Sequence, residues 1–114
     1  MRLLDTDAVI DQLRKREHQP GAISVITLIE VLRGTTREKR TTVKELLEES
    51  YPTLNLDNPS ILTYCELYAK LREEGQTLPD ADLLIAAGAI SRGMPLETRD
   101  AHFQRLTPHG LELA

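Results

Sequence analysis

Short apolar runs alternate along the chain with longer stretches in which apolar residues recur every three or four positions. Each short run predicts a β-strand, and the longer stretches predict amphipathic helices. The predicted strands cover residues 1–4, 22–24, 53–56, 94–98 and 111–113. Strands that alternate with helices in this way are typical of α/β folds with a mostly parallel sheet. We therefore predict a single three-layer α/β/α domain over residues 1–114, with a central sheet of four to five short strands.

Capping residues and glycines mark the ends of the predicted helices. Ser24 or Thr27 can cap a helix that Gly34 ends. A charged helix is expected from Arg37 to about Ser50. The apolar stripe of this helix is narrow. A further helix is predicted over residues 80–90, and its sequence is apolar nearly all round and rich in small residues. That second pattern predicts a central, tightly packed helix.

A long helix is predicted from about Pro59 to Glu74, with Asn58 or Ser60 as its cap. Apolar residues at helical spacing are the usual signature of a core face. We therefore assign this stripe to the core rather than to an interface, and expect its buried positions to include Ile61, Leu62, Cys65, Tyr68, Ala69 and Leu71. Farther on, a single helical turn is expected from Asp100 to Gln104.

Composition narrows the class of protein. The chain has 114 residues, of which 40% are hydrophobic, and a formal net charge of −4. That charge argues against a non-specific nucleic-acid coat protein, because such proteins carry a basic excess. A lone cysteine, Cys65, excludes an intrachain disulfide and is typical of a reducing compartment, where it would serve as a small buried apolar residue. Because the chain has neither an apolar run of membrane-spanning length nor a signal-peptide pattern, we expect a soluble cytoplasmic protein.

Four acidic residues stand where a polar side chain needs an explanation. Asp5 and Asp100 follow predicted strands, Glu30 interrupts an apolar run, and Asp82 lies in the first turn of the most apolar helix. In a parallel sheet, these positions can converge at the carboxyl ends of the strands. Converging carboxylates repel one another unless a cation neutralises them, and an oxygen-only set favours Mg²⁺ or Mn²⁺ over zinc. The spacing of the histidines fits no metal site: His18, His102 and His109.

Each acid also has a purely structural explanation. Asp5 and Asp100 are good helix caps, and an acid in the first turn of a helix, such as Asp82, is favoured by the helix dipole. Glu30 is the hardest to explain in this way, although Arg33 three residues later is an available partner.

Three strings, in this order, resemble the PIN-domain ribonucleases and most of all the VapC toxins of prokaryotic toxin–antitoxin pairs. They are LLDTDAVI, ISVITLIEVLRG and DADLLIAAGAISRGMPLETRDAHF. The resemblance implies a metal-dependent endoribonuclease that hydrolyses RNA phosphodiester bonds with water activated by one or two Mg²⁺ or Mn²⁺ ions. It implies as catalytic and metal-binding residues Asp5, Glu30, Asp82 and Asp100.

The same resemblance extends to neighbouring residues and to partners. Thr6 and Thr98 resemble hydroxyls that orient the acids, although both also fit as local caps. Asp80 competes with Asp82 for the third acidic position, and Asp82 fits the family pattern better. Glu97 stands where the family has an apolar strand residue, so it marks an exposed strand edge or joins the site. A homodimer and a cognate antitoxin that blocks the acidic groove are also implied.

Two other functions stay open at this point. Asp5 and Asp7 fit the D-x-D-x-[TV] signature of haloacid-dehalogenase-like phosphatases, in which the first Asp is a nucleophile, although no closing motif follows. The chain is also consistent with a non-catalytic protein-interaction domain. Basic residues form a cluster between positions 33 and 44: Arg33, Arg37, Lys39, Arg40 and Lys44. This cluster is either a solvated helix face or a surface that contacts RNA phosphates or an antitoxin.

Overall fold

A four-stranded parallel sheet forms the middle layer of the structure, a computed structural model that describes residues 1–114. The strands are β1 (Leu3–Leu4), β2 (Ala22–Ser24), β3 (Thr53–Leu54) and β4 (Leu96–Glu97), in the order β3-β2-β1-β4. The α/β class and the parallel sheet of four short strands confirm the prediction from sequence. The expected fifth strand at the end of the chain is reduced to one parallel bridge, between Leu113 and Leu96.

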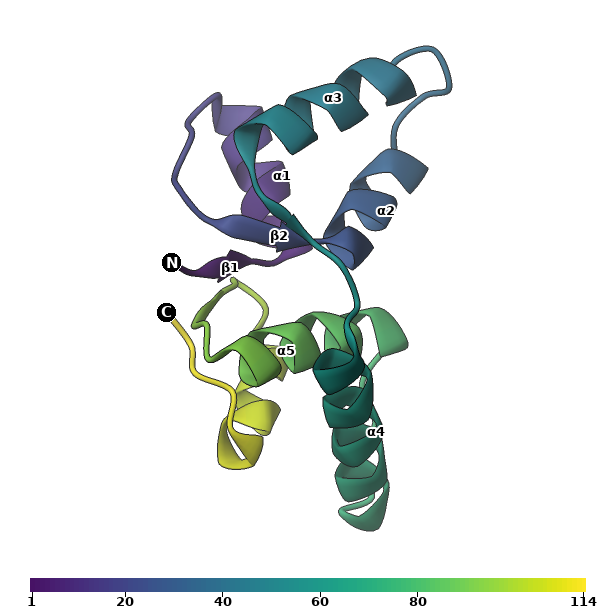
Figure 1. Ribbon diagram of the computed structural model, residues 1–114, viewed down its shortest axis with the longest axis vertical. Coiled ribbons are helices and arrows are strands. Elements are labelled where there is room, and N and C mark those ends of the chain that lie inside the picture. Colours follow the sequence, from purple (N-terminus) through teal and green to yellow (C-terminus); the bar gives the residue numbers. More distant parts are fainter.

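Helices cover both faces of this sheet (Figure 1). On one side lie α1 (Thr6–Lys15), α2 (Val25–Arg33) and α3 (Arg40–Ser50). On the other lie α4 (Asn58–Glu73), α5 (Asp80–Arg92) and the 3₁₀ helix η1 (Ala101–His109). The charged helix α3 begins three residues later than predicted, and η1 is longer than the single turn expected. None of the helices combines the length and the hydropathy that a membrane span requires.

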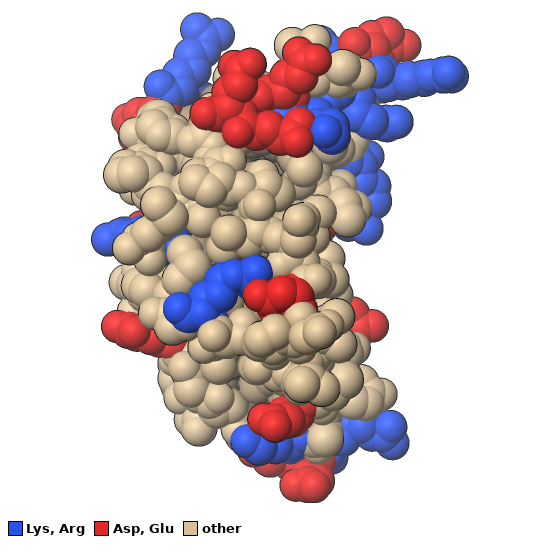
Figure 2. Space-filling model, viewed as in Figure 1, with Lys and Arg blue, Asp and Glu red and all other residues tan.

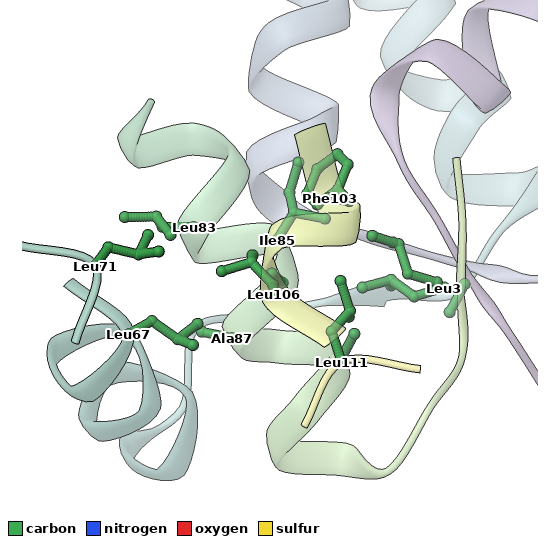
Figure 3. Packing of buried hydrophobic residues seen from close by; sticks show 13 residues of the cluster. Leu3, Leu67, Leu71, Leu83, Ile85, Ala87, Phe103, Leu106 and Leu111 are labelled. Atoms are coloured by element: carbon green, nitrogen blue, oxygen red, sulfur yellow. The ribbon is translucent and has the colours of Figure 1, made fainter. Parts of the chain in front are cut away.

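The core is divided by the sheet, because successive side chains of a strand point to opposite faces. Leu3 and Ala22, which are paired neighbours in β1 and β2, face α4, α5 and η1. Leu4 and Ile23, the next pair along, face α1, α2 and α3. Figure 3 shows the first of these clusters, in which Leu3 lies beside the side chains of α5 and η1.

The central helix α5 has the packing that its composition predicts. Its segment from Ile85 to Ala89 is buried without interruption. Small side chains allow the sheet, α4 and η1 to approach it from different sides. Gly93 ends the helix in the left-handed conformation, with φ of 64°, as expected. The position of α5 matters for function, because its first turn carries Asp82 to the carboxyl edge of the sheet.

The predicted burial of α4 is confirmed at Leu71 and wrong at the other five positions. Within this helix only Ser60, Leu67 and Leu71 are buried, whereas the other apolar positions assigned to the core are not: Ile61, Leu62, Cys65, Tyr68 and Ala69 are exposed. The reason is that α4 lies at the border of the molecule and packs through one side, mainly on α5 (Figure 1). Its cap is Asp57 rather than Asn58 or Ser60, and the Asp57 carboxylate accepts a hydrogen bond from the Ser60 amide at 3.0 Å.

Candidate active site

Four acids from separate parts of the sequence line one pocket at the carboxyl ends of β1 and β4. The pocket has a volume of about 130 Å³, and its acids come from the start of α1, from α2, from the first turn of α5 and from the start of η1. Ile85 and Phe103 supply its apolar walls. The four acids that the structure brings together here are Asp5, Glu30, Asp82 and Asp100.

Asp5 is the most firmly held of these acids. Its side chain is buried, and one carboxylate oxygen accepts a hydrogen bond from the Ala8 amide at 2.9 Å, which also caps α1. The other oxygen accepts a short hydrogen bond from the hydroxyl of Thr98. Burial raises the pKa of Asp5 above its usual value, and these two hydrogen bonds oppose that rise. Asp5 is therefore a cap and a pocket-lining carboxylate at once.

Thr98 also holds the next acid in place. Its hydroxyl oxygen accepts a hydrogen bond from the amide of Asp100 at 3.0 Å. The carboxylate of Asp100 in turn caps η1 by accepting from the amide of His102 at 2.9 Å. One threonine after β4 thus contacts both the carboxylate of Asp5 and the backbone amide of Asp100.

Thr6 has the corresponding position beside Glu30. The Thr6 hydroxyl donates a hydrogen bond to a carboxylate oxygen of Glu30 at 2.6 Å, and the Thr27 hydroxyl lies 3.2 Å from it. Arg33, the structural partner considered from the sequence, lies 3.8 Å from the other oxygen of Glu30, and its own side chain is mostly exposed. An exposed ion pair at that separation contributes little. The hydroxyl of Thr6 is therefore the stronger constraint on Glu30.

The pKa of Asp82 is raised both by burial and by the charges of several other acids of the pocket. Burial raises the pKa of Asp82, and the negative charges of Asp100, Glu30 and Asp5 raise it further. Within ion-pairing distance of the four acids there are only two basic groups, Arg33 beside Glu30 and His102 beside Asp100. The pocket thus concentrates negative charge that the chain itself leaves largely unneutralised.

Asp80 does not join this pocket. Its carboxylate accepts a hydrogen bond from the hydroxyl of Tyr64 on α4 at 2.6 Å, and this raises the pKa of Tyr64 to about 12. Residues two positions apart in the sequence lie about 200° apart around a helix axis, so Asp80 and Asp82 point to different sides of α5. Between the two acids that the sequence left in competition, only Asp82 lines the pocket.

Glu97 also lies outside the pocket. It stands on β4, where it forms an ion pair of 2.7 Å with Arg2. Asp7, which the sequence did not single out for the metal site, does line the pocket, from the exposed side of α1. The sequence feature that could have indicated this position is that Asp7 lies in the first turn of α1, two residues after Asp5. A first-turn side chain on that helix faces the same edge of the sheet.

The basic cluster lies at the end of α2, in the following loop and on α3. Figure 2 shows its lysines and arginines gathered at the upper right. Arg40 has a structural role, because its guanidinium donates to the carbonyl oxygens of Leu32 and Thr35, both at 3.2 Å. Lys44 pairs with Glu48 at 2.7 Å. Arg37 and Lys39, in contrast, have no ion-pair partner, and they carry the free positive charge of this region.

Comparison with known proteins gives the family of the chain. The sequence pattern described as "PIN domain" matches residues 2–107. Ribonuclease VapC1 of Methanocaldococcus jannaschii is 36% identical over 97% of this chain and 85% of its own length.

Solved structures agree with that relationship. The chain in the VapBC-1 structure from nontypeable Haemophilus influenzae is 26% identical, with a TM-score of 0.83 over 99% of this chain and 96% of that one. The chain in VapBC-5 from Mycobacterium tuberculosis, described as a member of the VapBC family of toxin-antitoxin systems, is 30% identical. Its TM-score is 0.74 over 99% of this chain and 98% of that one. The family excludes the haloacid-dehalogenase alternative. The chain therefore belongs to the PIN-domain family, and within it to the VapC-type ribonucleases.

Proposed function

We propose that this chain is a cytoplasmic endoribonuclease that cleaves RNA with one or two Mg²⁺ or Mn²⁺ ions held by the acids of the pocket. The ligands in this proposal are Asp5, Glu30, Asp82 and Asp100. The observation that carries it is the convergence of these four carboxylates on one pocket near which the chain supplies little positive charge. Burial and the charges of the neighbouring acids accordingly raise the pKa of Asp82. A hard divalent cation is the group that an oxygen-only set of mutually repelling carboxylates favours.

The residues of the pocket suit such an ion in kind and in charge. As the side chains lie, no three acids, histidines or cysteines are close enough together to share one ion. We therefore expect the carboxylates to turn inward when a cation neutralises them. When bound, the ion supplies polarisation of the phosphodiester, activation of water and stabilisation of the leaving oxygen.

The chain's own residues orient the acids for this chemistry. Thr98 donates to the carboxylate of Asp5 and accepts from the backbone amide of Asp100, and Thr6 donates to the carboxylate of Glu30, so the two hydroxyls restrain two carboxylates and the backbone that carries a third. Phe103 is buried behind the acids and excludes water from that side. Once the carboxylates have closed on a cation, such restraints reduce the reorganisation that is needed when charge develops on the substrate.

The proposal includes two protein partners. The solved relatives are VapBC complexes, one of them described as a toxin–antitoxin system, and we extend an antitoxin partner to this chain. We also propose that the chain is a homodimer. Arg37 and Lys39 are the free cations of the basic cluster, and contact with RNA phosphates or with an acidic antitoxin segment is their proposed role.

Cleavage of total cellular RNA tests the catalytic proposal. We expect cleavage with Mg²⁺ or Mn²⁺ by the wild type, and none in EDTA or with Asp82→Asn. Asp80→Asn is the matched control, because it makes the same chemical change two residues away and outside the pocket, and it should retain cleavage. Activity that survives EDTA or Asp82→Asn would overturn the proposal. A chain without nuclease activity under any of these conditions would support a non-catalytic interaction domain.

A further inference from the structure

The lysines and arginines of the chain differ in how far the protein itself neutralises them. Several lie within ion-pairing distance of a carboxylate, one donates to backbone carbonyls and one covers a tyrosine ring. Of the exposed cations without such a partner, only Arg37 and Lys39 belong to the segment that directly follows α2. Helix α2 brings Glu30 to the acidic pocket, so these two free charges lie on the continuation of a pocket-forming helix.

Arg33, in the last turn of α2, connects the two free cations with the pocket. Its guanidinium lies 3.8 Å from one carboxylate oxygen of Glu30, and three quarters of its side chain is exposed. Because such a pair contributes little, Arg33 can turn toward another anion at small cost. Figure 2 shows lysine and arginine side chains at the upper right and down the right edge of the molecule. We call Arg33, Arg37 and Lys39 the α2 basic row, which begins at the edge of the pocket.

The end of α2 is arranged so that it does not repel an anion beside the row. The last carbonyls of a helix carry partial negative charge. Here the carbonyl oxygens of Leu32 and Thr35 accept hydrogen bonds from the guanidinium of Arg40, both at 3.2 Å. Arg40 thus neutralises the helix end and ties the start of α3 to the loop. The charges of Arg37 and Lys39 in that loop stay available to a ligand.

A row of cations that starts at an acidic pocket suits a polyanion that passes through both. The inference rests on the proposed function, in which the pocket holds divalent cations and the phosphodiester to be cleaved. RNA carries one phosphate per nucleotide, so the neighbouring phosphates have to lie beside the pocket. Because the chain has a net charge of −4, those phosphates need local positive charge. An acidic protein segment would also be attracted to cations, but it has no reason to begin at the pocket end, beside Arg33.

We propose that the α2 basic row binds successive phosphates of the RNA strand on one side of the cleaved bond and guides the strand from the pocket across the end of α2. Arg33 contacts the phosphate nearest to the cleaved bond, and Arg37 and Lys39 contact phosphates farther along. These contacts are with the backbone alone, so they position the strand without selecting its sequence. Arg40 is a positioning residue, since it orders the loop without contacting RNA.

The salt dependence of RNA affinity counts the phosphate contacts. A fluorescein-labelled single-stranded RNA of random sequence is titrated by fluorescence anisotropy in Mg²⁺, and every protein carries Asp82→Asn so that the RNA stays intact. Arg33→Gln, Arg37→Gln and Lys39→Gln should each lower the slope of log Kd against log salt concentration by about 0.7. In the triple variant, the loss of affinity between about 50 and 200 mM salt should be smaller than in the parent by roughly 18-fold.

Arg14→Gln is the matched control for these substitutions. It removes the same charge from an exposed arginine without an ion-pair partner, but Arg14 lies in the last turn of α1, whose first turn is the one beside the pocket. Its slope should equal that of the parent. Arg37→Lys keeps the charge and should recover the slope that Arg37→Gln loses. Circular dichroism verifies that the exposed substitutions leave the fold unchanged.

Cleavage kinetics with Asp82 intact give a second readout. Arg37 and Lys39 contact parts of the RNA that do not react, and they bind them equally in the ground state and in the transition state. Substitution of either residue by Gln should therefore raise KM and leave kcat unchanged. A structural disturbance of the pocket would lower kcat instead, and a lower kcat with an unchanged KM contradicts the proposal.

RNA binding and RNA cleavage separate the failure of this proposal from that of the proposed function. Unchanged slopes for the three variants, or an equal fall for Arg14→Gln, would overturn the α2 basic row even in a chain that cleaves RNA. If the three variants bind RNA as the parent does but lose the antitoxin, the row belongs to an acidic protein segment and the proposal is wrong. A chain whose RNA affinity depends on the row, but which cleaves no RNA, supports the row and contradicts the nuclease function.

Discussion

Removing the hydroxyl of Thr6 tests whether the pocket depends on the hydrogen bond that holds Glu30 in place. Thr6→Val keeps the size and branching of the side chain but removes its hydrogen bond to Glu30. Hydrogen bonds to charged groups contribute about 1.5–3 kcal/mol. The carboxylate of Glu30 is about a quarter exposed, so water replaces part of the lost interaction and the lower end of that range applies.

The size of the effect follows from the length of the chain. Unfolding entropy of about 2.1 cal/mol/K per residue gives roughly 0.24 kcal/mol/K for 114 residues, so a loss of about 1.5 kcal/mol lowers Tm by about 6 °C. A similar loss in the transition state for cleavage would reduce kcat/KM by roughly tenfold. We expect the catalytic loss to exceed that figure, because a mobile Glu30 also disturbs the other acids.

Thermal unfolding without metal and RNA cleavage with Mg²⁺ measure the two effects. Thr6→Ser restores the hydroxyl without the methyl group and should recover most of both. If Thr6→Val unfolds and cleaves as the wild type does, the hydrogen bond does not hold Glu30. If Thr6→Ser is as impaired as Thr6→Val, packing of the methyl group rather than the hydroxyl is responsible.

Three further predictions concern stability in the absence of metal. Because burial and the neighbouring acids raise its pKa in the folded protein above the ordinary aspartate value of 3.8, ionised Asp82 destabilises the fold. This cost is absent below pH 3.8, grows as the pH rises from there to the folded pKa, and stays constant above it. Asp82→Asn should therefore unfold at higher urea concentration than the wild type at pH 7 but not below pH 3.8, and a lower midpoint at pH 7 would contradict the assignment. Gly21→Ala should cost about 1–3 kcal/mol in urea unfolding, because an added Cβ would lie 2.9 Å from the side chain of buried Leu4 and 3.1 Å from the Arg2 carbonyl oxygen; unchanged stability would show that Leu4 moves freely. Arg40→Ala should destabilise by about 1 kcal/mol through loss of its bonds to the Leu32 and Thr35 carbonyls, and Arg37→Ala, which loses no such bond, should leave the urea midpoint unchanged.

The sequence predicted the architecture because its signals are local. A strand of two or three apolar residues followed by a capping residue defines where β1 and β2 end, and the structure has Asp5 and Ser24 as those caps. Helix α5 is apolar around its whole circumference, a pattern that requires burial on every side. Parallel strands then bring the acids that follow them to one edge. The convergence of Asp5 and Asp100, which follow β1 and β4, results directly from this arrangement.

Tertiary structure alone decided which faces are covered and which of two nearby acids enters the pocket. Periodicity shows that α4 has apolar residues on its outer side, but not whether a neighbouring element packs there, because burial depends on contacts between segments far apart in sequence. The same limit applies to Asp80 and Asp82. Both are suitable first-turn acids, and only the rotation of α5 against the sheet points Asp82 into the pocket and leaves Asp80 to Tyr64.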